Sequence, residues 1–215
     1  MKTKFLTLAL LAALAACNRA PANNVATGNG SAAAANTAAP APAPAPAPAA
    51  APGQTAMPAG LDCVRNRLST DQRRAVADLA MEQGSRDDPR AQPLLQAAEA
   101  CAQELSWSTG KTNMASMFSM SAAGAAGLQE LLRGRGVNVD ELDRAILADQ
   151  ELIIAAGDPQ QLPTAAQQFV VRNAALLTRI AGEEGLDDEL GTRIGNYIAF
   201  RALVEGLARR FGQAA

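Results

Sequence analysis

The sequence predicts an all-α fold for the part of the chain that follows residue 60. From Leu61 onward no segment shows the strict polar–apolar alternation of a half-buried strand, and β-branched and aromatic residues are scarce. Helix start signals alternate with glycine and proline stop signals along the same region. We therefore expect a single up-and-down bundle of about five to six helices over residues 61–215.

The first half of this region begins with a short helical turn at about residues 61–67 and continues with three helices. Ser69 and Gln72 have the spacing of a capping box, and Gly84 is a stop signal. Asp87, Asp88 and the nearby prolines mark the next turn, and glycines follow the third helix. The predicted helices span about residues 70–83, 93–105 and 111–133.

The second half contains three further predicted helices. Asn138 and Glu141 form a start signal, glycine and two prolines break the chain near residue 160, and Asp187 begins the last helix. Apolar residues recur at helical spacing between these signals. The predicted helices span about residues 139–156, 164–181 and 188–211.

The N-terminus has the pattern of a secretory signal. Lys2 and Lys4 precede an apolar run over residues 5–14, which only Thr7 interrupts. This run is well short of the roughly 20 residues that a membrane-spanning helix needs. We interpret residues 1–16 as a signal peptide.

The last residues of this segment, Leu14-Ala15-Ala16-Cys17, resemble the lipobox of bacterial lipoproteins. The resemblance implies cleavage before Cys17 and lipid on its sulfur and its new N-terminus, so the membrane is an expected partner. Because residue 18 is Asn and not Asp, the same resemblance implies the outer membrane of the cell envelope, facing the periplasm. The alternative is an ordinary cleaved signal with a chance cysteine. The helical region resembles no family.

Residues 17–60 link the signal to the helical region. They are almost entirely Ala, Pro, Asn, Gly, Ser and Thr, with an Ala-Pro alternation over residues 40–52. Proline fixes φ and removes an amide donor, and bulky apolar side chains are missing. We expect a disordered, extended tether.

Composition excludes several classes of function. None of the 21 acidic residues and three of the 19 basic residues precede residue 61, so the helical region has a net charge near −5 and is a poor partner for nucleic acid. The chain has no histidine, which removes the commonest general base and metal ligand. We expect no enzyme activity, no cofactor and no metal.

Two cysteines remain in the helical region once Cys17 is set aside. In an exported chain, Cys63 and Cys101 predict a disulfide bond. Two antiparallel helices would bring them together. The alternative is a pair of buried free thiols.

Three polar residues fall on apolar helical stripes: Asp149, Asn173 and Arg201. A buried carboxylate needs a partner, so we expect Arg201 or Asn173 to satisfy Asp149. This cluster is either a small ligand site in a cleft or a structural hydrogen-bonded group, and the structural interpretation is favoured.

Met114, Met117 and Phe118 mark a second candidate site. Methionine adapts to irregular partners, so this face is either a binding groove or a contact with a neighbouring helix, and the helix contact is favoured. Small residues on the same helix allow a close neighbour.

Carboxylates cluster at residues 87–88, 183–184 and 187–189. Paired acids suit a glycosidase, but these lie at helix starts or in loops, where amide donors and the helix dipole explain them.

We therefore expect a lipid-anchored protein whose helical domain is non-catalytic and binds an envelope protein or acts as a scaffold. One alternative is a carrier that holds a small apolar ligand in a cavity of the bundle. The less favoured alternative is a carboxylate-based hydrolase acting on the cell wall. The sequence makes no prediction of oligomeric state.

Overall fold

The structure is a computed structural model that describes residues 58, 60–85, 87–182 and 185–214. The predicted signal peptide at 1–16, the lipidation site Cys17 and most of the predicted tether at 17–60 lie outside the described residues. The predicted domain at 61–215 is described apart from residues 86, 183–184 and 215.

The described residues confirm the all-α prediction, because they form nine α-helices and one short 3₁₀ helix and contain no strand. The helices are α2 (Leu61–Arg67), α3 (Thr70–Met81), η1 (Pro89–Ala91), α4 (Gln92–Glu104), α5 (Thr109–Gly134), α6 (Val139–Ala148), α7 (Gln150–Ala156), α8 (Leu162–Arg172), α9 (Ala174–Ile180) and α10 (Asp188–Gln213).

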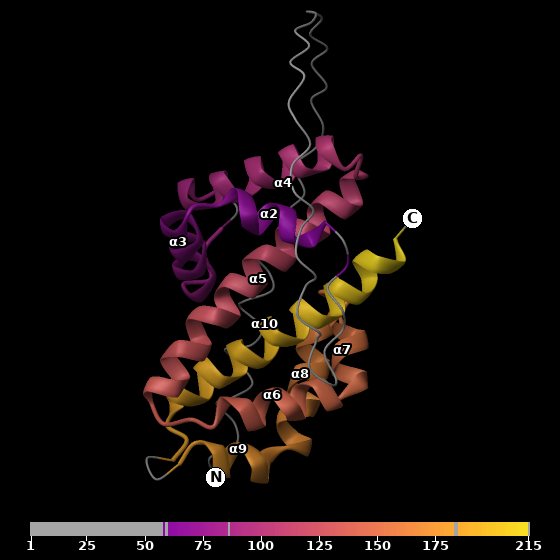
Figure 1. Cartoon of the computed structure of the whole chain (residues 1–215). Coiled ribbons are helices and arrows are strands. Elements are labelled where there is room, and N and C mark those ends of the chain that lie inside the picture. Colours follow the sequence, from indigo (N-terminus) through magenta and orange to yellow (C-terminus); the bar gives the residue numbers. More distant parts are fainter. Residues whose placement is uncertain (1–57, 59, 86, 183–184, 215) are drawn as a thin grey trace, which may run out of the picture.

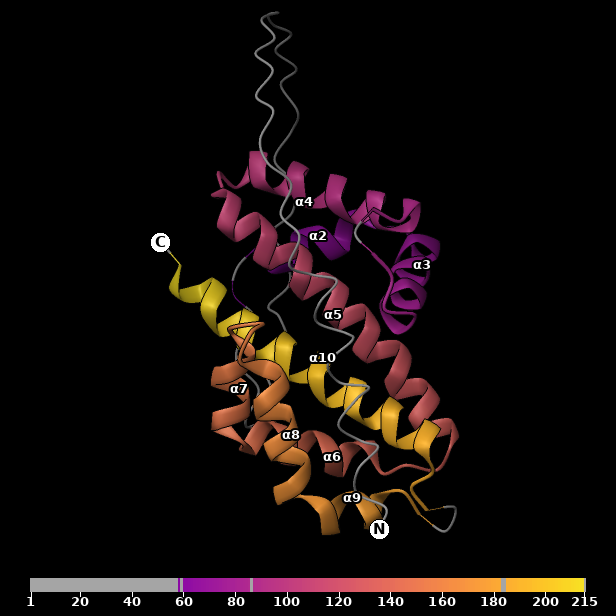
Figure 2. The same ribbon diagram turned by 180° about the vertical axis from the view of Figure 1, so that it is seen from behind.

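The two 26-residue helices α5 and α10 form the centre of the domain. They lie side by side and run in opposite directions, and they make the most extensive contact of any helix pair in the described residues (Figures 1 and 2). Helices α2, α3 and α4 pack on α5, while α6, α7 and α8 pack on α10. The flanking helices run at angles to the central pair, so the arrangement departs from the up-and-down row that the sequence predicts (Figure 1).

Two of the predicted helices are each broken in two, which is why the structure has more helices than expected. The first break is at Asp149, whose backbone is extended and whose carboxylate accepts the Leu152 N–H at 3.0 Å, starting α7. The second is at Asn173, which ends α8 and precedes α9. An Asp or Asn side chain that hydrogen-bonds to nearby backbone groups competes with the backbone hydrogen bonds of a helix. The Asp149 side chain accepts a backbone N–H at the first break, and the Asn173 side chain donates to a backbone carbonyl at the second.

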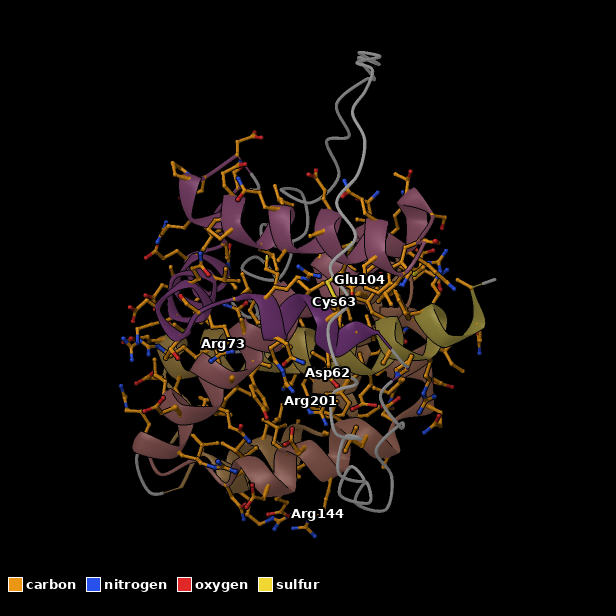
Figure 3. All side chains as sticks on the ribbon, turned by 45° about the horizontal axis from the view of Figure 1, so that its top comes forward. Asp62, Cys63, Arg73, Glu104, Arg144 and Arg201 are labelled. Atoms are coloured by element: carbon orange, nitrogen blue, oxygen red, sulfur yellow. A yellow bond between two sulfur atoms is a disulfide. The ribbon has the colours of Figure 1, made fainter. Side chains whose placement is uncertain are left out.

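Other local predictions are confirmed. Ser69 and Gln72 form the expected capping box at the start of α3. Cys63 on α2 and Cys101 on α4 form the predicted disulfide, with Cα atoms 6.0 Å apart (Figure 3). The bond ties the short helix α2 to the more securely packed α4.

The core lies between the central helix pair and the flanking helices. Its largest fully buried side chains include Tyr197, Phe169, Leu61, Leu79, Leu94, Leu132, Leu142, Ile146, Leu152, Ile153, Leu162 and Leu190. The contact between α10 and the end of α7 depends on Gly206, because a Cβ there would lie 2.7 Å from the Gly157 amide nitrogen and 2.8 Å from the Ala156 carbonyl carbon.

Candidate functional site

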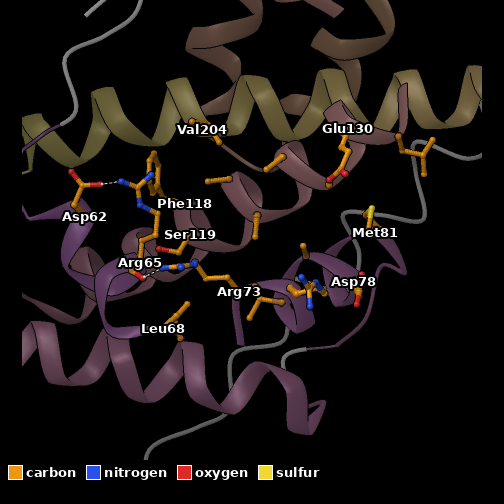
Figure 4. A pocket seen from close by; sticks show the side chains of 18 residues that line it. Asp62, Arg65, Leu68, Arg73, Asp78, Met81, Phe118, Ser119, Glu130 and Val204 are labelled. Carbon is orange, nitrogen blue, oxygen red and sulfur yellow. Dashed lines mark hydrogen bonds and ion pairs between the residues drawn. The ribbon is translucent and has the colours of Figure 1, made fainter. Parts of the chain in front are cut away.

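A groove lies along α5, between α5 and the α2–α3 segment (Figure 4). It has a volume of about 760 Å³, within the range of about 300–1,000 Å³ that is usual for binding sites. Val204 of α10 also contributes to its wall. We call it the α3–α5 groove.

The floor of the α3–α5 groove is one face of α5. Its small side chains are Ala122, Ala123 and Ala126, and the larger Phe118 and Leu131 stand at its two ends. These end residues are 13 positions apart, which corresponds to about 20 Å along a helix. Small residues leave room for an occupant to approach the α5 backbone closely.

Helix α3 forms one wall of the groove with Val76, Ala77 and Met81. The wall stands close to α5 because two glycines of α5 leave space. A Cβ on Gly124 would lie 3.0 Å from the Ala80 Cβ, and one on Gly127 would lie 3.0 Å from the Met81 sulfur. The apolar faces of α3 and α5 thus meet below the groove.

Arg65 and Arg73 lie at one end of the groove with Asp62, near the junction of α2 and α3 (Figure 4), whereas Arg74 lies one helical turn before Asp78 on α3. Arg65 pairs with Asp62 at 2.9 Å, and Arg74 lies 3.7 Å from Asp71. Arg73 instead donates to the Arg65 carbonyl at 3.4 Å and to the Thr70 hydroxyl at 3.3 Å. Both acceptors of Arg73 are neutral, so this end of the groove retains positive charge.

The opposite end of the groove is acidic. Asp78 of α3 and Glu130 of α5 lie there, close to Met81 in the view of Figure 4. Both are exposed, and neither forms an ion pair with another described residue. The groove therefore carries opposite charge at its two ends, with an apolar floor between them.

A buried hydroxyl lines the basic end. Ser119 is only 8% exposed, and its oxygen has no hydrogen-bond partner among the described residues. A buried polar atom without a partner costs free energy and is uncommon in folded proteins. An occupant that hydrogen-bonds to this hydroxyl would remove the cost.

The predicted face of Met114, Met117 and Phe118 contributes only in part. Phe118 lines the groove, whereas Met114 and Met117 pack against the hydrophobic core. The groove lies further along α5 than the methionine pattern indicates. Its position is set by α3, whose placement the sequence of α5 does not reveal.

The three polar residues predicted to cluster belong to separate groups. Asp149 pairs with Arg172 of α8 at 2.6 Å, so its charged partner is Arg172 and not Arg201. The side-chain amide of Asn173 donates to the Phe169 carbonyl at 2.9 Å. Both interactions are local to the helix breaks described above.

Arg201 belongs to a polar group between α6 and α10. It lies 2.8 Å from Glu205, which is 5% exposed, and 3.4 Å from Asp143. The Tyr197 hydroxyl donates to Asp143 at 2.8 Å. Burial, followed by the nearby Asp143 charge and this hydrogen bond, raises the pKa of Tyr197 above its usual value. Sequence reasoning missed Asp143, although its position three residues before Ile146 places it at the edge of the buried stripe of α6.

The carboxylate clusters serve as helix caps and ion pairs where they are described. Asp187 accepts the Leu190 N–H at 2.6 Å, and Glu189 pairs with Arg193. Hydrogen bonding from Arg90 lowers the pKa of Asp88. Residues 183–184 lie outside the described residues.

Within the described part of the chain, no helix is both long enough and apolar enough to cross a bilayer. Comparison with protein-family models, curated proteins and solved structures finds no match to the chain. The chemistry of the α3–α5 groove is therefore the basis for assigning a function.

Proposed function

We propose that the chain is a lipid-anchored envelope protein whose helical domain is a non-catalytic binding module, and that the α3–α5 groove binds a segment of another envelope protein. The observation that carries the proposal is the groove's construction: an apolar floor about 20 Å long, open on one side, with charged residues at its rim. This is the anatomy of protein interfaces, which combine an apolar centre with a polar rim.

A polypeptide suits this groove better than a small apolar ligand does. Ala126, Asp78 and Glu130 are exposed, so the groove is open to solvent at the end that holds Glu130. A carrier of apolar ligands needs an enclosed cavity, and Met114 and Met117, which were candidates to line one, are not among the residues that line the groove.

The proposed cellular location rests on the sequence. The signal at 1–16 and the lipobox resemblance at Cys17 support lipid anchoring, and the outer membrane facing the periplasm is the proposed location. The Cys63–Cys101 disulfide supports export, because disulfides persist in oxidising compartments. Replacing Cys17 with serine is expected to move the protein from the membrane fraction to the soluble fraction. Unchanged membrane retention would contradict the anchor.

Site-specific photocrosslinking tests the binding site. A photoreactive phenylalanine analogue at Ala126 on the groove floor is compared with one at Ala175 on α9, another exposed helical alanine. We expect a discrete crosslinked protein from position 126 in intact envelopes and none from position 175. Equal patterns from the two positions, or no product from either, would contradict the proposal.

A further inference from the structure

We infer that the occupant of the α3–α5 groove is an amphipathic helix that is acidic at its N-terminal end, which lies at Arg73, and basic at its C-terminal end, which lies at Glu130. The inference rests on the proposed function, which makes this groove a protein-binding site. It adds the conformation, charge order and direction of the bound segment.

The dimensions of the floor suit a helix. The distance of about 20 Å from Phe118 to Leu131 equals about 13 residues of helix, or nearly four turns. The alanines between these ends allow close approach, and an apolar stripe along one helix face would cover them. Helix-in-groove docking of this kind uses anchors at successive turns.

The charges set the order of the acidic and basic residues in the occupant. Arg73 bonds only to neutral oxygens among the described residues, whereas Arg65 and Arg74 each have a nearby carboxylate. An acidic residue of the occupant is therefore favoured near Arg73. At the other end, Asp78 and Glu130 favour a basic residue.

The direction follows from helix electrostatics. Both α3 and α5 run from the Arg73 end of the groove toward the Glu130 end. Acidic residues stabilise the first turn of a helix and basic residues stabilise its last turn. A helix with its acidic N-terminal end at Arg73 and its basic C-terminal end at Glu130 matches the charges of the groove and is also stabilised by its own dipole. Such a helix runs in the same direction along the groove floor as α5.

The hydroxyl of Ser119 is a second and independent sign of an occupant. It is 92% buried, lacks a partner among the described residues and lines the end of the groove that holds Arg73 (Figure 4). An amide or carboxylate side chain from the first turns of the occupant would hydrogen-bond to it.

Two synthetic peptides of about 14 residues test the inference. Both have the same composition, with leucine and alanine on one face and a lactam bridge on the other face that holds the helix. One has two glutamates in its first turn and two lysines in its last turn, and the second has these charges exchanged. Each peptide carries a photoreactive residue in its first turn. We expect the peptide with acidic residues first to prefer crosslinking at the Arg73 end of the groove, and the peptide with exchanged charges to prefer the Glu130 end.

Protein variants identify the groups that set the preference. Exchanging the two ends, with Arg73→Glu and Glu130→Arg, is expected to reverse the end of the groove that the first turn of each peptide prefers. The control exchange, Arg144→Glu with Glu99→Arg, also preserves net charge but uses exposed residues outside the groove, and Arg144 lies far from Arg73 in Figure 3. We expect this control to leave the preference unchanged. By fluorescence anisotropy at low salt, Ser119→Ala is expected to weaken binding of the peptide with acidic residues first about threefold, without lowering the stability of the free domain.

Crosslinking of both peptides at the same end of the groove, or the same end preference in both exchange variants, would overturn the inference. Binding of dodecanoate at the groove, with no binding of either peptide, would also overturn it and would indicate a lipid-like occupant. If crosslinking from Ala126 succeeds while the peptides show no preference, the proposed function stands and only the bound helix and its direction are wrong.

Discussion

The guanidinium of Arg172 at the end of α8 lies 2.6 Å from a carboxylate oxygen of Asp149, the residue that begins α7. The other carboxylate oxygen accepts the Leu152 N–H at 3.0 Å. One side chain thus caps a helix and holds it against its neighbour. Because the Arg172 side chain is 41% exposed, solvent screens the ion pair, and we expect the cap to contribute more to stability than the ion pair.

Asp149→Ala is expected to lower the free energy of unfolding by about 1–2 kcal/mol, the usual range for losing an N-cap. Asp149→Asn keeps a capping oxygen and is expected to cost less than half as much. Urea unfolding followed by the fluorescence of Trp107, the only tryptophan, provides the measurement. Glu151→Ala, at an 81% exposed side chain, is the matched control, and an equal effect there would contradict the capping role.

Reduction of the Cys63–Cys101 bond is expected to lower the free energy of unfolding by about 4 kcal/mol, because the bond closes a long loop in the unfolded chain. A double variant in which Cys63 and Cys101 are both replaced with serine is expected to have the same free energy of unfolding as the reduced protein. Because Asp62 and Arg65 flank Cys63 and line the groove, we also expect weaker binding at the groove after reduction. A loss of less than about 1 kcal/mol would show that α2 is held by packing alone.

Tyr197 is the only tyrosine in the chain, so its ionisation is measured without interference from another phenol. Burial raises its pKa in the folded protein, and the ultraviolet titration is expected to occur well above the value near 10 seen after unfolding. Since the folded state holds this proton more tightly, its contribution to stability is complete below about pH 10 and is lost as pH rises further. Asp143→Asn is expected to move the folded titration downward. An unchanged, near-normal titration in the folded protein would contradict the buried phenol.

Gly206→Ala is expected to destabilise the domain by about 1–3 kcal/mol, the usual cost of overpacking. The added Cβ would meet backbone atoms of α7, which cannot rotate away as a flexible side chain does. Gly134→Ala is the control, because a Cβ there meets nothing within 4 Å. Thermal unfolding is expected to show a lower midpoint for Gly206→Ala only.

The capping signals explain why helix starts were predictable. Ser69, Asn138 and Asp187 each accept a backbone N–H at the start of the helix that the sequence places after them. The breaks at Asp149 and Asn173 were not predictable from periodicity, because the apolar stripe continues in phase across both residues. Asp149 fits both that stripe and the N-cap position of α7, where it accepts the Leu152 N–H, and the spacing of apolar residues does not separate the two.

The candidate site was predictable only at Phe118. The charge-free, small-residue face of α5 is visible in the sequence, but it becomes a groove only because α3 stands against it. That placement depends on Gly124 and Gly127 meeting Ala80 and Met81, which are contacts between residues far apart in the chain. The order of charges along the groove could not be predicted either, because it depends on how α3 and α5 are placed relative to one another.

The most direct test of the account is the yield of crosslinked protein from position 126 in intact envelopes, measured with and without a filled groove. Ala122→Trp places an indole on the groove floor, and Ala175→Trp places one on α9. We expect Ala122→Trp to abolish the product and Ala175→Trp to leave its yield unchanged. An undiminished yield in the folded Ala122→Trp protein would contradict the groove as the binding site.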